Sequence, residues 1–371
     1  MRIVLTGGVT GGHIYPAIAI GDKFRTEDPN NAVVYIASGH PLERQIIPDA
    51  GYELYEVDSE PLSRKNFLHL FKTFGNTVKG RMEAISIMRK FKPDVVISTG
   101  SYVSVPVVLA AHALGASVYL HEQNGYPGVS NRTMARFAKA VFLGFDAAAK
   151  YFPDSATLVS SGNPVRKEFY GRDRAADRKA LGIPEDDMVI MVFGGSQGAE
   201  TTNAVGERLA EKYAGKEGYT LIWGTGSAYY DQMGTDIDAK GIAADNIRVM
   251  PYISDMPAML SACDVSICRS GALSVAETTM AGRCAIFIPS PNVTEDHQYH
   301  NARAVADKGG AFIVTEDEGA YKAAGEICKI LDKLDANRSL IREMEEASLS
   351  LAPSRASDII YEKIMETYKS R

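Results

Sequence analysis

Cysteine is scarce in this sequence, and the pattern of its few cysteines excludes a structural zinc site. The four are Cys263, Cys268, Cys284 and Cys328, and they lack the paired spacing of zinc ligands. The apolar opening "MRIVL" is too short for a secretory signal core, so we expect reduced cytosolic thiols. Excess positive charge is also lacking, because the 371 residues carry a formal net charge of −6. This balance disfavours a general nucleic-acid binder.

The sequence has a long run without charged residues, and this run does not predict a transmembrane helix. Residues 98–120, "STGSYVSVPVVLAAHALGASVYL", contain no Lys, Arg, Asp or Glu. Gly100, Pro106 and Gly115 interrupt the run. These breaks predict the end of a strand, a turn, a short helix and the next strand.

The glycine-rich turn "LTGGVTGGHIYP", residues 5–16, lacks the residues that would make it a familiar nucleotide loop. A P-loop needs a lysine and a hydroxyl residue after Gly12, where this chain has His13 and Ile14. Val9 and Thr10 break the glycine spacing of the dinucleotide fingerprint, and no carboxylate ends the next strand, "AVVYIASG". What remains is a turn that places Thr10 and His13 beside a helix start, suited to a hydroxyl or a phosphate.

Apolar strands alternate with helical patterns along the whole chain, which predicts parallel sheets covered by helices. The sequence also repeats itself. "DVVISTGSYVSV" from Asp94 aligns without gaps with "DVSICRSGALSV" from Asp264, and "RIVLTGG" from Arg2 is similar to "VIMVFGG" from Val189. The two pairs of similar segments occur in the same order in both halves of the chain. This order indicates two doubly wound domains of similar topology. Gly162, Asn163 and Pro164 mark the break between them.

Polar residues gather where strands end, the edge at which such sheets bind ligands. Ser270 and Gly271 open a helix whose free N–H groups suit a diphosphate, and Glu277 on that helix can accept both hydroxyls of a ribose. A solvated helix charge is the alternative for Glu277. His121, Glu122, Gln123 and Asn124 follow another strand. The "TEDHQYHN" stretch at 294–301 favours sugar or phosphate hydrogen bonds over a metal site.

Six motifs together resemble one bacterial enzyme family. They are "GGVTGGHIYP", "GSYVS", "HEQNGYPGVSN", "GNPVR", "GGSQGA" and "CRSGALSVAE". In this order they resemble the MurG family of undecaprenyl-diphospho-muramoylpentapeptide β-N-acetylglucosaminyltransferases over about residues 3–301. The resemblance implies an α/β glycosyltransferase B-type fold of two Rossmann-like domains facing a cleft. It also implies UDP-N-acetylglucosamine (UDP-GlcNAc) as donor, lipid I as acceptor, lipid II for peptidoglycan as product, and neither cofactor nor metal.

The resemblance also divides the chain and assigns its residues. Residues 1–163 would form the acceptor and membrane-associating domain, 164–353 the UDP-GlcNAc-binding domain, and 354–371 a helix that packs back on the first. The implied nucleotide-sugar residues are Thr10, Gly11, Gly12, Asn124, Arg166, Ser196, Ile253, Ala272, Leu273, Ser274, Val275, Ala276, Glu277 and Gln298. The implied acceptor residues are Thr10, His13, Tyr102, His121, Glu122 and Asn124. His297 and His300 stand where relatives vary.

The residues and the resemblance agree on an inverting transfer in which an acceptor hydroxyl attacks the anomeric carbon as UDP leaves. His13 is the candidate catalytic base, because imidazole titrates near neutral pH and the adjacent helix start should keep the ring neutral. A hydrogen-bonding, non-catalytic His13 is the alternative.

A lipid acceptor requires contact with a membrane surface. Residues 61–93 hold eight Lys or Arg and one acid, Glu83. Five apolar residues interleave with these cations: Phe67, Leu68, Leu70, Phe71 and Phe74. Such a segment suits anionic lipid at the cytoplasmic face of the cell membrane, and a helix packed on the sheet is the alternative.

Other functions remain open from the sequence. They are a related transferase with another lipid or small-molecule acceptor, a UDP-sugar epimerase, and a silent sugar-nucleotide sensor.

Overall fold

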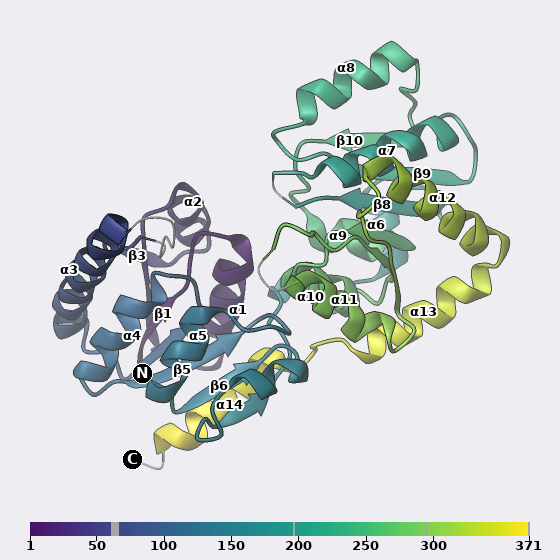
Figure 1. The fold of residues 1–371 in the computed structure, drawn as a ribbon. Coiled ribbons are helices and arrows are strands. Elements are labelled where there is room, and N and C mark those ends of the chain that lie inside the picture. Colours follow the sequence, from purple (N-terminus) through teal and green to yellow (C-terminus); the bar gives the residue numbers. More distant parts are fainter. Residues whose placement is uncertain (61–66, 196, 294–295, 370–371) are drawn as a thin grey trace. The chain divides into compact units, whose positions relative to one another are not determined.

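The computed structural model describes residues 1–60, 67–195, 197–293 and 296–369, and of residues 67–74 only the backbone. The chain divides into two compact units, one comprising Met1–Arg166 with Arg355–Arg371 and the other Lys167–Ser354. The borders expected from the sequence fall after residues 163 and 353. Each unit contains one parallel sheet with helices around it (Figure 1). The predicted architecture of two α/β domains, each built on a parallel sheet, is confirmed.

The sheet of the first unit has seven strands in the order β3-β2-β1-β4-β5-β6-β7. Its inner strands are mostly apolar runs buried on both faces, as β1 illustrates: Val4 belongs to one core cluster and Ile3 and Leu5 to the other. The edge strands β3 and β7 are only partly buried. The strands are β1 (Arg2–Thr6), β2 (Ala32–Ala37), β3 (Glu53–Glu56), β4 (Val95–Ser98), β5 (Ser117–Glu122), β6 (Ala140–Leu143) and β7 (Leu158–Ser160). The α-helices are α1 (Gly11–Glu27), α2 (Pro41–Asp49), α3 (Phe67–Phe91), α4 (Ser104–Ala113), α5 (Val129–Met134) and α14 (Ala356–Lys369).

The sheet of the second unit has six strands in the order β10-β9-β8-β11-β12-β13. Trp223 of β9 is fully buried in its core. The strands are β8 (Met188–Phe193), β9 (Tyr219–Gly224), β10 (Ile247–Met250), β11 (Val265–Cys268), β12 (Cys284–Phe287) and β13 (Ala311–Ile313). The α-helices are α6 (Arg174–Ala180), α7 (Glu200–Tyr213), α8 (Tyr230–Lys240), α9 (Met256–Ala262), α10 (Ala272–Met280), α11 (His297–Ala306), α12 (Ala320–Ala336) and α13 (Arg338–Ser350).

The two sheets share a topology, and this explains the internal echo in the sequence. Asp94 precedes β4 and its carboxylate accepts a hydrogen bond from the Arg2 N–H at 2.7 Å. Asp264 precedes β11 and its carboxylate accepts one from the Val189 N–H, also at 2.7 Å. Each aspartate thus ties its strand to the strand beside it, β1 or β8.

The charge-free stretch at 98–120 is interrupted as predicted. It contains the end of β4, a turn, α4 and the first part of β5. Among the residues that the structure describes, no helix is long and apolar enough to span a bilayer.

Helix α14 packs on the first unit although it comes after the second in the chain. Ile360 and Ile364 are fully buried in the same core cluster as Phe24 of α1. The Tyr361 ring lies edge-on to that of Phe24, with 4.9 Å between centroids, and Asp358 pairs with Lys23 at 2.6 Å. These contacts hold the end of the chain against α1.

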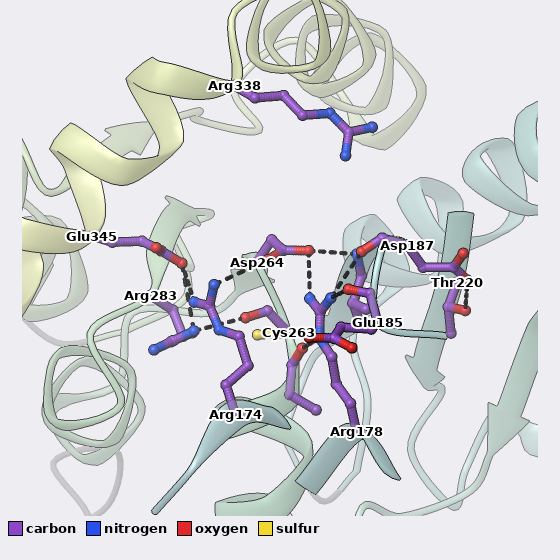
Figure 2. Close-up of polar contacts among 12 residues, drawn as sticks. Arg174, Arg178, Glu185, Asp187, Thr220, Cys263, Asp264, Arg283, Arg338 and Glu345 are labelled. Carbon is purple, nitrogen blue, oxygen red and sulfur yellow. Dashed lines mark hydrogen bonds and ion pairs between the residues drawn. The ribbon is translucent and has the colours of Figure 1, made fainter. Parts of the chain in front are cut away.

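The second unit has an ion-pair network where its strands begin (Figure 2). Arg178 of α6, 6% exposed, donates to the carboxylate of Asp264 at 2.8 Å and to the carbonyl oxygens of Ala262 and Asp187. Glu345 of α13 pairs with Arg174 and Arg283. Burial raises the pKa of Glu345 above its ordinary value. The network joins α6 and α13 to the sheet at the edge opposite the carboxyl ends of the strands.

Candidate functional site

In the first unit, the glycine-rich turn connects β1 to α1 at the carboxyl end of the sheet. Val9 is the turn's non-glycine residue with a positive φ, at 72°. Thr10 is exposed and is the N-cap residue of α1, and Gly11 and Gly12 form its first turn. The N–H groups of Gly11 and Gly12 precede the first intrahelical hydrogen bonds, so they are available to an oxygen-rich ligand. The His13 N–H donates to the Thr10 carbonyl oxygen at 3.1 Å.

The His13 ring is held by the neighbouring β4–α4 turn. Its Nδ1–H donates to the carbonyl oxygen of Thr99 at 2.8 Å, and the Thr99 hydroxyl donates to the His13 carbonyl oxygen at 2.7 Å. A carbonyl oxygen can only accept, so Nδ1 carries the proton. In the neutral ring, Nε2 is therefore the nitrogen with a free lone pair.

His121 lies next in the same network, and its ring is buried. Nε2–H of His121 donates to the Gly162 carbonyl oxygen at 3.1 Å, and Nδ1 accepts from the Gln123 amide at 3.2 Å. That amide also donates to the Thr99 carbonyl oxygen at 2.9 Å. Burial lowers the pKa of His121 to about 4, so the ring is neutral at pH 7. Both ring nitrogens of His121 are thus engaged within the protein.

The Glu122 carboxylate shapes the loop that follows β5. It accepts hydrogen bonds from the Asn124 N–H at 3.0 Å, the Gly128 N–H at 3.1 Å and the Asn131 amide at 2.9 Å. Asn124 and Tyr102 are half-buried nearby at the same sheet edge. Arg166, at the end of the first unit, places its guanidinium 4.8 Å from the centre of the Tyr15 ring.

In the second unit, the turn after β11 leads directly into α10. Ser270 is fully buried, its carbonyl oxygen accepts from the Asn301 amide at 3.2 Å, and its hydroxyl has no hydrogen-bond partner among the described residues. Gly271 is the N-cap of α10. The predicted helix start is therefore present at this sheet edge. It comprises Ala272, Leu273, Ser274, Val275, Ala276 and Glu277.

Glu277 and two further predicted donor residues, Gln298 and Ile253, lie in the described part of the second unit. Glu277 is 6% exposed on α10, so it is not a fully solvated helix charge. Gln298, on α11, accepts from the Ser290 N–H at 3.0 Å, and Ile253 is buried beyond β10. Ser196 lies outside the described residues.

The sequence reasoning missed contacts between residues that are distant in the chain. Gly198 adopts a φ of 82°, and a Cβ there would lie 2.1 Å from the Thr225 carbonyl oxygen. The turn after β8 is thus packed against the turn after β9. The sequence analysis did not single out the turn after β9. The glycine and threonine in "WGTGS", directly after a strand, were the available signal. Thr99 and Asn131 lie within segments quoted above, but nothing in the sequence indicated the contacts that they make.

Metal ligation was the other chemistry to examine. Among the described ranges, no group of three or more His, Cys, Asp or Glu side chains lies close enough to hold a metal ion.

Comparison with known proteins identifies the family. The model of the glycosyltransferase family 28 N-terminal domain matches residues 3–143, and that of the family 28 C-terminal domain matches residues 189–360. The chain belongs to glycosyltransferase family 28. The resemblance seen in the sequence is confirmed.

Relatives of similar length carry one name. The "UDP-N-acetylglucosamine--N-acetylmuramyl-(pentapeptide) pyrophosphoryl-undecaprenol N-acetylglucosamine transferase" of Caldicellulosiruptor saccharolyticus is 36% identical, over 100% of this chain and 98% of its own. The protein of that name from Clostridioides difficile is 36% identical, over 100% and 90%.

Solved structures resemble this family 28 chain as well. The crystal structure of MurG from Acinetobacter baumannii has a TM-score of 0.72 at 27% identity and covers 97% of this chain and 99% of its own. A UDP-GlcNAc 2-epimerase from Neisseria meningitidis has a TM-score of 0.68 at 14% identity, covering 99% and 100%. The second likeness shows the fold alone.

Proposed function

We propose that this glycosyltransferase moves N-acetylglucosamine from UDP-GlcNAc to the C4 hydroxyl of the muramoyl residue of lipid I, with inversion at the anomeric carbon. The product would be lipid II, used in peptidoglycan synthesis. The observation that carries the proposal is the full-length similarity to transferases of that name, at 36% identity. The burial of Glu277 and the start of α10 directly after Ser270 and Gly271 agree with this proposal.

The second unit would hold the donor. The first turn of α10 would receive the diphosphate, whose growing charge the helix dipole stabilises as UDP leaves. Glu277 would accept the ribose hydroxyls, while Ile253 and Gln298 would contact the rest of the nucleotide sugar. Arg166, Ser196 and Asn124 remain proposed donor contacts. No resident cofactor or metal ion is part of the proposal.

The first unit would hold the acceptor. Thr10 and the amides of Gly11 and Gly12 would bind polar groups of the substrates, and Tyr102 and Asn124 would contact the muramoyl part. His13 would take the proton from the C4 hydroxyl at Nε2, because its Nδ1–H is bonded to Thr99. His121 and Glu122 are buried and bonded within the protein, so they would support the acceptor residues rather than touch the sugar.

The segment 61–93 would bring the enzyme to anionic lipid at the cytoplasmic face of the membrane as a peripheral protein. Val78 and Met82, one turn apart on α3, are 45% and 66% exposed, and Ala84 and Met88 on the same helix are buried. Residues 61–66 and the side chains of the five apolar residues Phe67, Leu68, Leu70, Phe71 and Phe74 lie outside the described part.

The experiment that tests the proposed function follows UDP release from UDP-GlcNAc with and without a lipid I analogue. We expect release that depends on the acceptor. Conversion of the nucleotide sugar without acceptor would indicate the epimerase alternative. Release with a different lipid or small hydroxyl compound, but not with the lipid I analogue, would indicate a related transferase.

A further inference from the structure

Glu43, on α2, is a fully buried carboxylate directly beneath the glycine-rich turn of the first unit. It occupies the third position of its helix, where its Oε2 accepts the backbone N–H of His40 at 2.8 Å. This contact is half of a capping box and would by itself explain a glutamate at the start of a helix. It does not explain complete burial.

The other oxygen of Glu43 reaches out of its own helix. Oε1 accepts the Val9 N–H at 2.8 Å, and the Ser38 hydroxyl lies 3.0 and 2.9 Å from the two carboxylate oxygens. Within the described ranges, no Lys, Arg or His forms an ion pair with Glu43. Removing a carboxylate from water is costly, and here neutral N–H and O–H donors compensate for it.

The backbone that Glu43 holds has an uncommon conformation. Val9 lies in the left-handed region, at a φ of 72°, which is strained for a β-branched residue. A Cβ at Gly8 would lie 2.0 Å from Oε1 of Glu43, so the turn rests closely on the carboxylate. Thr99 holds the other end of the turn through its two hydrogen bonds to His13.

We propose that Glu43 is a positioning residue for the transfer reaction. It holds Val9 in the left-handed conformation, and so sets where the His13 ring meets the acceptor. The role of Glu43 in the transfer reaction rests on the proposed function. The role of Glu43 in holding the conformation of the glycine-rich turn does not depend on that function.

Glu43→Gln tests the proposal with little change in volume. The glutamine keeps one acceptor oxygen, so either the Val9 or the His40 N–H loses its partner. We expect kcat with the lipid I analogue to fall by about 10- to 100-fold, as for a misplaced catalytic group, with the KM for UDP-GlcNAc within about twofold. The matched control is Glu56→Gln, on β3, because Glu56 is exposed and pairs with Arg44. It should leave kcat unchanged.

A double variant separates positioning from general stability. If Glu43 acts through His13, adding Glu43→Gln to His13→Ala should slow turnover by less than about threefold beyond His13→Ala alone. A multiplicative loss in the double variant would overturn the proposal, since a merely destabilising change acts whether or not His13 is present.

Hydrogen exchange gives a readout that needs no substrate. We expect the hydrogen-bonded amides of Val9 and His13 to exchange faster in Glu43→Gln than in the unmodified protein, and to be unchanged in Glu56→Gln. Absence of transfer by the unmodified enzyme would count against the proposed function alone, because exchange still decides the role of Glu43. If Glu43→Gln does not fold, the same measurements are made on Ser38→Ala. That variant removes one hydrogen-bond donor to Glu43 and keeps the carboxylate. Unchanged exchange, or kcat within twofold, would refute the proposal.

Discussion

The His13 ring illustrates how one carbonyl group can select the chemistry of a side chain. The Thr99 carbonyl oxygen accepts from Nδ1 at 2.8 Å and leaves Nε2 as the basic nitrogen. Gln123 donates to the same oxygen and to His121, whose burial keeps it neutral. The network thus fixes the tautomer of the residue that we propose as the base.

His13→Ala removes that base. We expect turnover to fall by about 10²- to 10⁴-fold, with the affinity for UDP-GlcNAc little changed, because general base catalysis acts on the acceptor. Steady-state kinetics with varied donor and varied acceptor measure this. The control is His112→Ala, since His112 is exposed on α4. Turnover by His13→Ala at a near wild-type rate would remove His13 from the role.

His121 predicts a pH dependence of stability. Its folded pKa, about 4, lies below the ordinary 6.5, so its contribution is complete above pH 6.5 and is lost as pH falls toward 4. The loss amounts to about 3 kcal/mol of unfolding free energy. Denaturant unfolding at pH 7 and pH 4.5, compared with His121→Gln, measures it. The same pH dependence in both proteins would contradict the assignment.

The sequence indicated candidate residues of this site but not the contacts among them. A glycine-rich turn followed by His13 was visible because it is local in the chain. Glu43 and Thr99 were not, because they reach the turn from other strand and helix ends, far along the chain. Neither the periodicity of apolar residues nor the spacing within a motif indicates contacts between residues so far apart in the chain.

At the scale of elements, the strands were predictable because buried parallel strands are continuous apolar runs. The echo between Asp94 and Asp264 was informative for a physical reason: both carboxylates bind the N–H of the neighbouring strand. By contrast, the return of α14 was expected only from the family resemblance. The spacing of Ile360 and Ile364 in the sequence is typical of an amphipathic helix, but it does not indicate which core the helix joins.

Ile364→Ala tests the packing of α14. Ile364 is fully buried, so the cavity left should cost about 2–5 kcal/mol in the unfolding free energy of the first unit. Urea unfolding followed by circular dichroism measures it. Trp223, the single tryptophan, lies in the second unit, so its fluorescence transition should move less. Glu362→Ala, an exposed position on the same helix, is the control. Equal transitions for both variants would show that Ile364 does not anchor the helix.

At the scale of the whole molecule, charge is unevenly distributed. The chain has a net charge of −6, yet residues 61–93 carry eight cations and one acid. Lys79 of this segment pairs with Asp58 outside it and with Glu83, so not every cation there is available to lipid. The sequence indicated the two-sheet fold through the alternation of strands and helices.

Vesicle flotation tests the membrane role. Each cation near an anionic surface contributes about 1 kcal/mol, so replacing the exposed Arg89 and Lys90 by Gln should lower partitioning into anionic vesicles by about tenfold or more. Lys308→Gln with Lys329→Gln, in the second unit, is the matched control. Equal recovery of the unmodified protein with anionic and neutral vesicles would argue against the electrostatic contribution.

The most direct measurement is the structure of the product formed from UDP-GlcNAc and a lipid I analogue. Proton NMR of the purified product distinguishes the anomers and locates the new linkage. Inversion at the donor, whose sugar is α-linked to UDP, predicts a β-linked N-acetylglucosamine on the C4 oxygen of the muramoyl residue. An α-linkage, another position, or a nucleotide sugar altered without any lipid-linked product would contradict the account.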